Sequence, residues 1–130
     1  IEIHQDNTYI QTFFDYFKND IKKYFPDFGF TVEGSSASFY ILRNMVPAGL
    51  FVASEHDKRT LKINLDFVMP EYRDFKIGKF IFDNNVNYFK DKGYTKLISY
   101  ADNKEHTDYL KKMGFHIANE GGASLLVRNL

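Results

Sequence analysis

The chain of 130 residues has no cysteine and no tryptophan, only three prolines, and no excess of charge of either sign. Without cysteine there can be no disulfide, no thiolate metal site and no cysteine nucleophile. Lys and Arg number 17, as do Asp and Glu, so the basic excess with which nucleic-acid-binding proteins displace counterions is missing. We therefore expect no nucleic-acid partner, while a local basic pocket for a small anion stays open.

Long apolar runs are missing as well. No stretch approaches the roughly 20 apolar residues of a membrane-spanning helix, and no signal-peptide pattern opens the chain. We therefore expect a cytoplasmic location, which the lack of cysteine also favours. The first residue is Ile1 rather than Met. This start fits a processed chain and also a fragment of a longer one, including the cytoplasmic part of a membrane protein.

Aromatic residues are abundant, with 14 Phe and 9 Tyr. The apolar share of 44% and the charged share of 26% are typical of globular proteins. A chain of this length buries roughly two-thirds of the surface that its unfolded form exposes, enough for a core of its own. We expect a single domain over residues 1–130, with a core built largely of Phe.

The hydrophobic pattern predicts a mixed α/β domain. Apolar residues at spacings of three and four predict helices over 6–25, from about 76 to 93, and over 104–113. Gly114 follows the last of these helices at a C-cap position. Alternating or β-rich runs predict strands at 1–3, 39–42, 48–52, 60–69, 96–100, 117–118 and 125–127, with turns at 44–47 and 55–59.

The segment Val68–Phe80 favours a phosphate-binding site. A strand ends there, a charged turn follows, and a helix begins at about Lys76. The first turn of a helix presents backbone N–H groups that have no partner within the helix, and these bind phosphates. Gly78 would let the backbone approach such an anion, and the surrounding basic residues could add contacts. An ordinary strand-to-helix connection with solvated charges is the alternative.

Two motifs resemble those of the GNAT superfamily (GCN-related N-acetyltransferases), which are acyl-CoA-dependent N-acyltransferases. Residues 73–78, Arg-Asp-Phe-Lys-Ile-Gly, resemble its Gln/Arg-x-x-Gly-x-Gly/Ala motif. Ala-Asp-Asn at 101–103, a helix, and Lys-Met-Gly-Phe at 112–115 resemble a second conserved segment of that family. The order of elements also fits, over residues 36–127. The resemblance implies a mixed, mostly antiparallel sheet flanked by helices, with central strands that splay apart.

The resemblance also implies where acetyl-CoA lies. Its pantetheine arm would pair with the end of the 60–69 strand, its pyrophosphate would lie on the backbone after that strand, and Asn103 would contact the arm. Asn103 is equally placed to cap the helix that follows it. The implied cofactor-binding residues are Phe67, Val68, Met69, Arg73, Asp74, Phe75, Lys76, Ile77, Gly78, Lys79 and Asn103.

The sequence departs from the family pattern at two positions. Lys76 replaces the first motif glycine, and Leu110 replaces the Tyr that protonates the departing thiolate in many members. Tyr109 is adjacent, but one residue is about 100° around a helix, so its hydroxyl should point elsewhere. His106, four residues before Leu110, is the remaining candidate acid, because histidine titrates near neutrality. A packed or capping histidine is the alternative.

Asp66 is the candidate general base, since it lies two residues before Val68 on the polar face of the strand. Glu71 and Glu33 are further candidates, and a solvated sheet face is the alternative for Asp66. The four histidines show no metal-ligand spacing, so we expect no metal.

We therefore expect an N-acetyltransferase that uses acetyl-CoA and a small-molecule or peptide amine. A non-catalytic CoA-binding sensor or interaction module of a larger, membrane-associated protein is the alternative. The acceptor loops, about 24–38 and 53–60, carry no readable signature.

Overall fold

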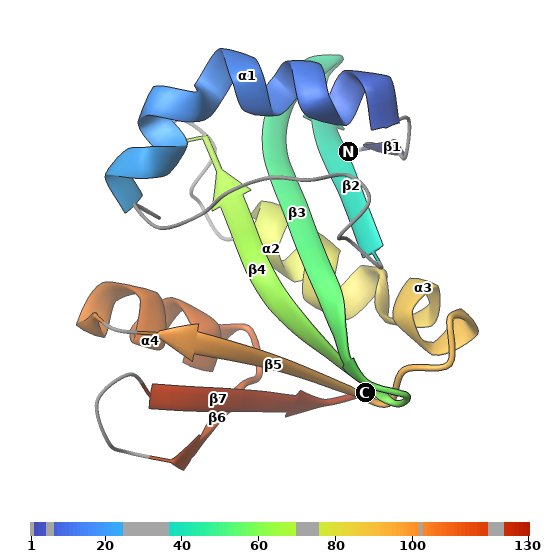
Figure 1. Ribbon diagram of the computed structural model, residues 1–130, viewed down its shortest axis with the longest axis vertical. Coiled ribbons are helices and arrows are strands. Elements are labelled where there is room, and N and C mark those ends of the chain that lie inside the picture. The colour runs from blue at the N-terminus through green and yellow to red at the C-terminus, as the bar shows by residue number, and fades with distance from the viewer. Residues whose placement is uncertain (1, 5–6, 25–36, 70–75, 102, 120–123) are drawn as a thin grey trace. The chain divides into compact units, whose positions relative to one another are not determined.

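A computed structural model describes residues 2–4, 7–24, 37–69, 76–101, 103–119 and 124–130 (Figure 1). The elements are, in chain order, β1 (Glu2–His4), α1 (Asn7–Tyr24), β2 (Ala37–Arg43), β3 (Val46–Asp57), β4 (Thr60–Val68), α2 (Lys76–Lys79), the π-helical segment η3 (Phe80–Asn84), α3 (Val86–Asp91), β5 (Lys96–Ala101), α4 (Lys104–Lys112), β6 (His116–Asn119) and β7 (Ser124–Asn129).

The strands form one mixed sheet in the order β1-β2-β3-β4-β5-β7-β6. The pairs β1–β2, β2–β3, β5–β7 and β6–β7 are antiparallel, whereas β4 and β5 are parallel. The parallel ladder covers only Thr60–Lys62 against Lys96–Ile98, although both strands continue beyond it. The expected mixed, mostly antiparallel sheet with helices is confirmed.

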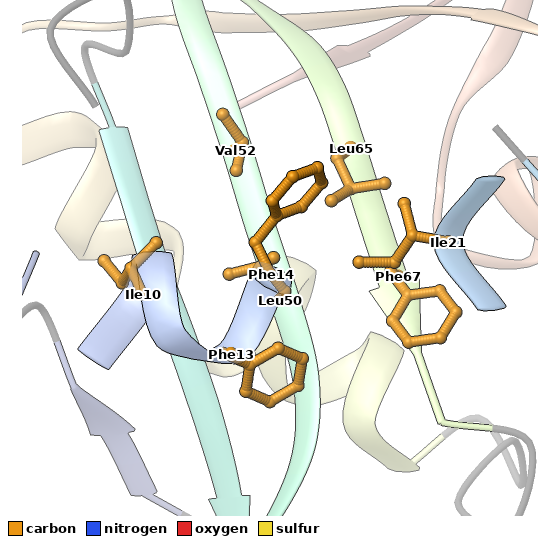
Figure 2. Close-up of a cluster of buried hydrophobic side chains, with 8 residues drawn as sticks. All are labelled: Ile10, Phe13, Phe14, Ile21, Leu50, Val52, Leu65 and Phe67. Carbon is orange, nitrogen blue, oxygen red and sulfur yellow. The ribbon is translucent and has the colours of Figure 1, made fainter. Parts of the chain in front are cut away.

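The chain divides into two compact units, the first comprising residues 1–54 and 64–77 and the second residues 55–63 and 78–130. In the first unit, apolar residues of α1 recur on one face of the helix and pack on β3 and β4, as Figure 2 shows. This core consists of Ile10, Phe13, Phe14, Ile21, Leu50, Val52, Leu65 and Phe67.

The second unit is held by the ladder of β5 with β7, which runs in register from Lys96–Asn129 to Ala101–Ser124. Helix α4 contacts both strands. It ends as the sequence predicts: Gly114 has a φ of 89°, a value that costs glycine little, and Phe115 N–H donates to the Leu110 carbonyl at 3.0 Å.

Both β-turns are shorter than expected. The β2–β3 turn is Asn44–Met45, not 44–47, and both residues have positive φ angles, 53° and 65°. A two-residue hairpin turn of this kind matches the twist of its strands. Pro47 lies within β3, opposite Leu42 where the register shifts, because a bulge tolerates a residue without an N–H. The second turn is Lys58–Arg59 rather than 55–59.

The single helix expected from residue 76 to 93 is wrong in detail. The π-helical segment η3 separates α2 from α3, and the C-cap of η3, Asn85, has φ −105° and ψ 16°. The apolar spacing did not reveal this interruption, because a π-turn adds one residue without removing the apolar pattern on either side.

Candidate functional site

The first unit contributes the end of β4. Met69 N–H donates to the Ala48 carbonyl on β3 at 2.8 Å. Successive backbone N–H groups of a strand point to opposite edges, so Val68 N–H points to the edge of β4 that faces away from β3. β3 and β4 approach closely at Gly49, where a Cβ would lie 3.1 Å from the Phe67 carbonyl oxygen. The strand end is thus fixed in orientation by its neighbour.

Asp66 is buried, with 6% of its surface exposed and both carboxylate oxygens shielded from solvent. The expected alternative, in which Lys62, Asn64 and Asp66 line a solvated sheet face, is therefore wrong for Asp66. Asn64 is half-buried and its Nδ2 donates to the Ser54 hydroxyl on β3 at 2.9 Å. Phe67 and Val68 are buried as well.

Several expected site residues lie outside the described residues. These are the donor-binding candidates Arg73, Asp74 and Phe75 and the alternative bases Glu71 and Glu33. Lys76 begins α2, as expected, Ile77 is fully buried, and Lys79 is exposed.

Gly78 lies against α4, within the second unit. A Cβ on Gly78 would lie 2.6 Å from the Tyr109 hydroxyl oxygen and 2.8 Å from the Met113 sulfur. The glycine therefore has a packing role that the sequence did not indicate: it lets α2 and α4 come close. The spacing Tyr109–Met113, four residues on one face of α4, was the signal that could have suggested it.

The start of α4 is capped by Asn103. Its Oδ1 accepts a hydrogen bond from His106 N–H at 2.8 Å, and Thr107 Oγ1 donates to its backbone carbonyl at 2.9 Å. The capping role expected for Asn103 is thus confirmed. Its role toward a cofactor stays a prediction.

His106 and Tyr109 are neighbours on α4. Their ring centroids are 6.5 Å apart with the planes at 22°, and His106 Nε2 and the Tyr109 hydroxyl are both shielded from solvent. Leu110 is fully buried, so the residue at the family's tyrosine position is a core residue. Tyr109 points in another direction, as expected, and that direction is toward Gly78 of α2.

Sequence reasoning also missed the pairing of Lys62 with Tyr100. Lys62 Nζ lies 5.4 Å from the centroid of the Tyr100 ring, within the second unit. Lys62 pairs with Ile98 in the parallel ladder, and Tyr100 lies two residues further along β5 on the same face. Only the register between β4 and β5 brings the two together, and a single sequence does not state that register.

Among the described residues, no group of three or more His, Asp or Glu side chains is arranged to hold a metal ion. In the same parts of the chain no helix is both long and apolar enough to cross a membrane.

No protein-family model and no curated protein sequence matches the chain. Solved structures do. PaiA N-acetyltransferase from Thermoplasma acidophilum, in complex with coenzyme A, has a TM-score of 0.76 at 14% identity, over 99% of this chain and 98% of that one. A GNAT family acetyltransferase from Elizabethkingia anophelis with acetyl-CoA bound has a TM-score of 0.67 at 20% identity, over 99% of this chain and 97% of that one.

GCN5 from Tetrahymena has a TM-score of 0.72 at 17% identity, over 98% of this chain and 94% of that one. At these identities the likeness is one of fold. The chain therefore has the GNAT fold over nearly its whole length, as its two motifs implied.

Proposed function

We propose that this chain is an acetyltransferase that binds acetyl-CoA and transfers the acetyl group to an amine on a small molecule or peptide. The observation that carries the proposal is the GNAT fold, shared over 99% of the chain with proteins solved with coenzyme A or acetyl-CoA bound. The described residues of both motifs also fall on the expected elements: 76–78 lie in α2, and 103 and 112–115 lie at the two ends of α4. On this proposal residues 1–130 act as one acyl-CoA-binding domain.

The end of β4 would hold the donor. An extended molecule can add to a strand edge and pair with its backbone. Val68 N–H points to the edge away from β3, so the pantetheine arm would pair along Phe67–Met69 on that side. The pyrophosphate would lie on the backbone of residues 74–79, with Arg73 and Lys79 supplying charge and Asn103 contacting the arm.

The reaction would be a direct attack. The neutral amine nitrogen bonds to the thioester carbonyl carbon, and the oxygen takes the negative charge, which Val68 N–H would stabilise. The C–S bond then breaks, the thiolate takes a proton, and the nitrogen loses one. We propose Asp66 as acceptor of the amine proton and His106 as the thiolate's acid. The two carboxylate oxygens of Asp66 and the Nε2 atom of His106 are shielded from solvent, so proton exchange with these atoms would need a local opening of the structure around them.

Donor binding is tested by thermal unfolding with acetyl-CoA. At one hundred times its dissociation constant the ligand should stabilise the fold by about 2.7 kcal/mol. Arg73→Ala should weaken binding, whereas Arg59→Ala, at an exposed turn, should not. Gly78 is a poor probe, because its Cβ would strike α4 directly. An unchanged melting temperature at saturating acetyl-CoA would end the proposal.

The acid is tested by His106→Ala, with exposed His116→Ala as control. Turnover should fall by about 100-fold with little change in acetyl-CoA affinity, the usual loss for one acid. At a fixed concentration of the neutral amine, the wild-type rate should also fall as pH rises, because only the protonated imidazole can donate. A His106→Ala variant with wild-type turnover removes this residue from the mechanism. If all variants bind acetyl-CoA and none acetylates any amine of a broad panel, the sensor function replaces catalysis.

A further inference from the structure

Aromatic rings form a continuous series in the first unit, along one side of α1 and onto β2. Tyr9 meets Tyr40 of β2 edge to face, with ring centroids 6.4 Å apart, and Tyr40 is 6.5 Å from Phe13. The Phe13 and Phe17 centroids are 4.8 Å apart, and those of Phe17 and Tyr16 are 4.7 Å apart. We call these five residues the aromatic strip.

The strip is open to solvent along α1. Tyr9 and Tyr16 are seven residues apart, a spacing that returns to the same side of a helix, and their exposed fractions are 60% and 81%. Phe17 and Tyr40 are half-buried and pack against the core beneath them. Contiguous apolar surface of this kind is typical of a binding site. The strip is therefore a candidate for the contact with a ligand.

One end of the strip lies toward β4. In Figure 2, α1 crosses the sheet from Ile10, at β2, to Ile21, at β4. Phe17 is one turn before Ile21 on the same face of the helix. Tyr9, in contrast, adjoins Ile10 and contacts β2. The part of the strip that contains Tyr16 and Phe17 is thus the part nearer to β4.

The strip also lies on the side of α1 that is turned toward the end of β4. In Figure 2 the Phe14 ring lies between Val52 and Leu65, whereas Phe13, a member of the strip, lies on the side of Phe67. Phe67 is two residues nearer than Leu65 to the end of β4. The strip and the end of β4 are therefore neighbours on one face of the first unit.

Met69 joins the strip to the proposed donor site. It follows β4 directly, is half-buried, and packs against the same core cluster as Phe17. Its Cα is about 3.8 Å from the Cα of Val68, whose N–H is the proposed partner of the thioester oxygen. All of these residues belong to the first unit. An amine whose apolar group packs on Met69 needs only a short carbon chain to reach the thioester.

We infer that Tyr16, Phe17 and Met69 form an acceptor subsite for an aromatic group, so that the amine acetylated by this protein carries an aromatic ring on a short carbon chain. Aromatic rings gain from packing on one another and on methionine sulfur beyond the area that they bury. The subsite therefore favours a ring over a small aliphatic group. The inference rests on the proposed acetyl transfer, and it adds the chemical class of the acceptor.

The kinetic test compares amines that differ in the side group alone. Phenylalanine amide and alanine amide are assayed for acetyl-CoA-dependent release of coenzyme A. The wild type should favour phenylalanine amide by about tenfold or more in kcat/KM, because the subsite buries the ring. The free amine 2-phenylethylamine and a peptide that begins with Phe distinguish the two sources of such a ring. Equal kcat/KM values for the two amides would overturn the inference.

The strip supplies its own matched control. Tyr16→Ser should reduce the preference for the aromatic amide severalfold, whereas Tyr9→Ser, two turns earlier on the same side of α1, should leave it intact. Both side chains are exposed, so neither substitution should unfold the protein, and stabilisation by acetyl-CoA should be unchanged in both variants. Equal losses of preference in the two variants would contradict a subsite at the β4 end of the strip.

A binding readout separates this inference from the proposed function. The chain has three methionines, Met45 in the β2–β3 turn, Met69, and Met113 at the end of α4. Protein labelled with ¹³C in the methionine methyl groups is titrated with 2-phenylethylamine and with ethylamine. The aromatic amine alone should shift the Met69 resonance, through the magnetic field of its ring, and it should do so more weakly in Tyr16→Ser. The Met45 and Met113 resonances should stay in place.

The outcomes of this titration are distinct. If the Met69 shift occurs but acetyl-CoA does not bind, the subsite holds and the transferase function fails. If acetyl transfer occurs without aromatic preference and without the Met69 shift, the subsite is refuted and the transferase function stands. A shift at Met45 or Met113 alone would place the amine elsewhere and would also refute the subsite.

Discussion

In the second unit, Gly78 is the described glycine at which an added Cβ would come nearest to another atom. In Gly78→Ala the new Cβ would meet the Tyr109 hydroxyl and the Met113 sulfur, which are the ends of side chains that can shift, and alanine favours the helix, so we expect a net loss of no more than about 1 kcal/mol in the free energy of unfolding. In a Tyr109→Phe background the same substitution should cost less, because the closest atom is gone. Urea unfolding of the four proteins measures this coupling.

Gly93 provides the control for that cycle. It has a φ of +94° and no heavy atom within 4 Å of an added Cβ. Gly93→Ala should therefore cost about 1 kcal/mol for backbone strain alone, and Tyr109→Phe should not change that cost. Equal coupling at both glycines would mean that the contact between Gly78 and Tyr109 is not the cause.

Asp57 gives a pH-dependent prediction at the β3–β4 turn. Its carboxylate accepts a hydrogen bond from Arg59 N–H at 2.9 Å, and this bond, with those from Thr60, holds the pKa of Asp57 below its usual 3.8. A lowered folded-state pKa means that the carboxylate stabilises the fold above the unfolded pKa, and that this contribution disappears as pH falls through the folded value.

The stability difference between wild type and Asp57→Ala should therefore be larger at about pH 7 than at about pH 2. Urea unfolding at the two pH values measures it. The comparison variant is Asp91→Ala, because the Asp91 side chain is exposed and makes no hydrogen bond of this kind with the described residues. A difference that stays constant with pH would show that the carboxylate charge does not act through this turn.

At the scale of elements, Arg128 joins three of them. From β7 its guanidinium pairs with Asp83 of η3 at 2.9 Å and also bonds to the Met113 carbonyl after α4. Asp83 is half exposed, so the ion pair contributes little, and the bond to the helix-end carbonyl should dominate.

Arg128→Met should consequently destabilise the fold by about 1–3 kcal/mol, because it leaves the Met113 carbonyl without this donor. Asp83→Asn should cost less than about 1 kcal/mol. Thermal unfolding followed by circular dichroism ranks the two. The reverse order would assign the stabilisation to the ion pair.

Periodicity predicted the elements whose apolar faces repeat without interruption. The spacing in α1, the alternation in β4 and Gly114 after α4 each point to one structure, and each is found. The π-turn and the two-residue turn at Asn44–Met45 were missed, because each depends on backbone angles that the apolar pattern does not encode.

For the whole molecule, two short motifs were enough to predict the fold, since they also had to occur in the right order. The side-chain environments were harder. Asp66 alternates with apolar residues as an exposed residue would, yet it is buried. Gly78 with Tyr109, and Lys62 with Tyr100, meet only through tertiary structure, which no local pattern contains. The catalytic and donor-binding residues stay predictions.

The balance of 17 basic and 17 acidic residues has a consequence for the chain in solution. With an isoelectric point near 7.1, the molecules repel one another least at neutral pH. We expect self-association at low ionic strength to be greatest near pH 7 and to decrease at about pH 9, where net charge restores repulsion. Light scattering across pH measures it; attraction that grows toward pH 9 would contradict the expectation.

The π-turn at Phe80–Asn84 sets the phase between the two ends of this helical stretch. Its wider turn absorbs one residue more than an α-helical turn does, so the helical segments before and after it keep their apolar faces. Removing one residue from this turn would convert it to an α-helical turn without rotating those segments, whereas the same deletion within a regular helix such as α1 would rotate one side by about 100°. In evolutionary terms, a single-codon deletion here is more tolerable than one within α1, so homologues should vary in length by one residue at this turn.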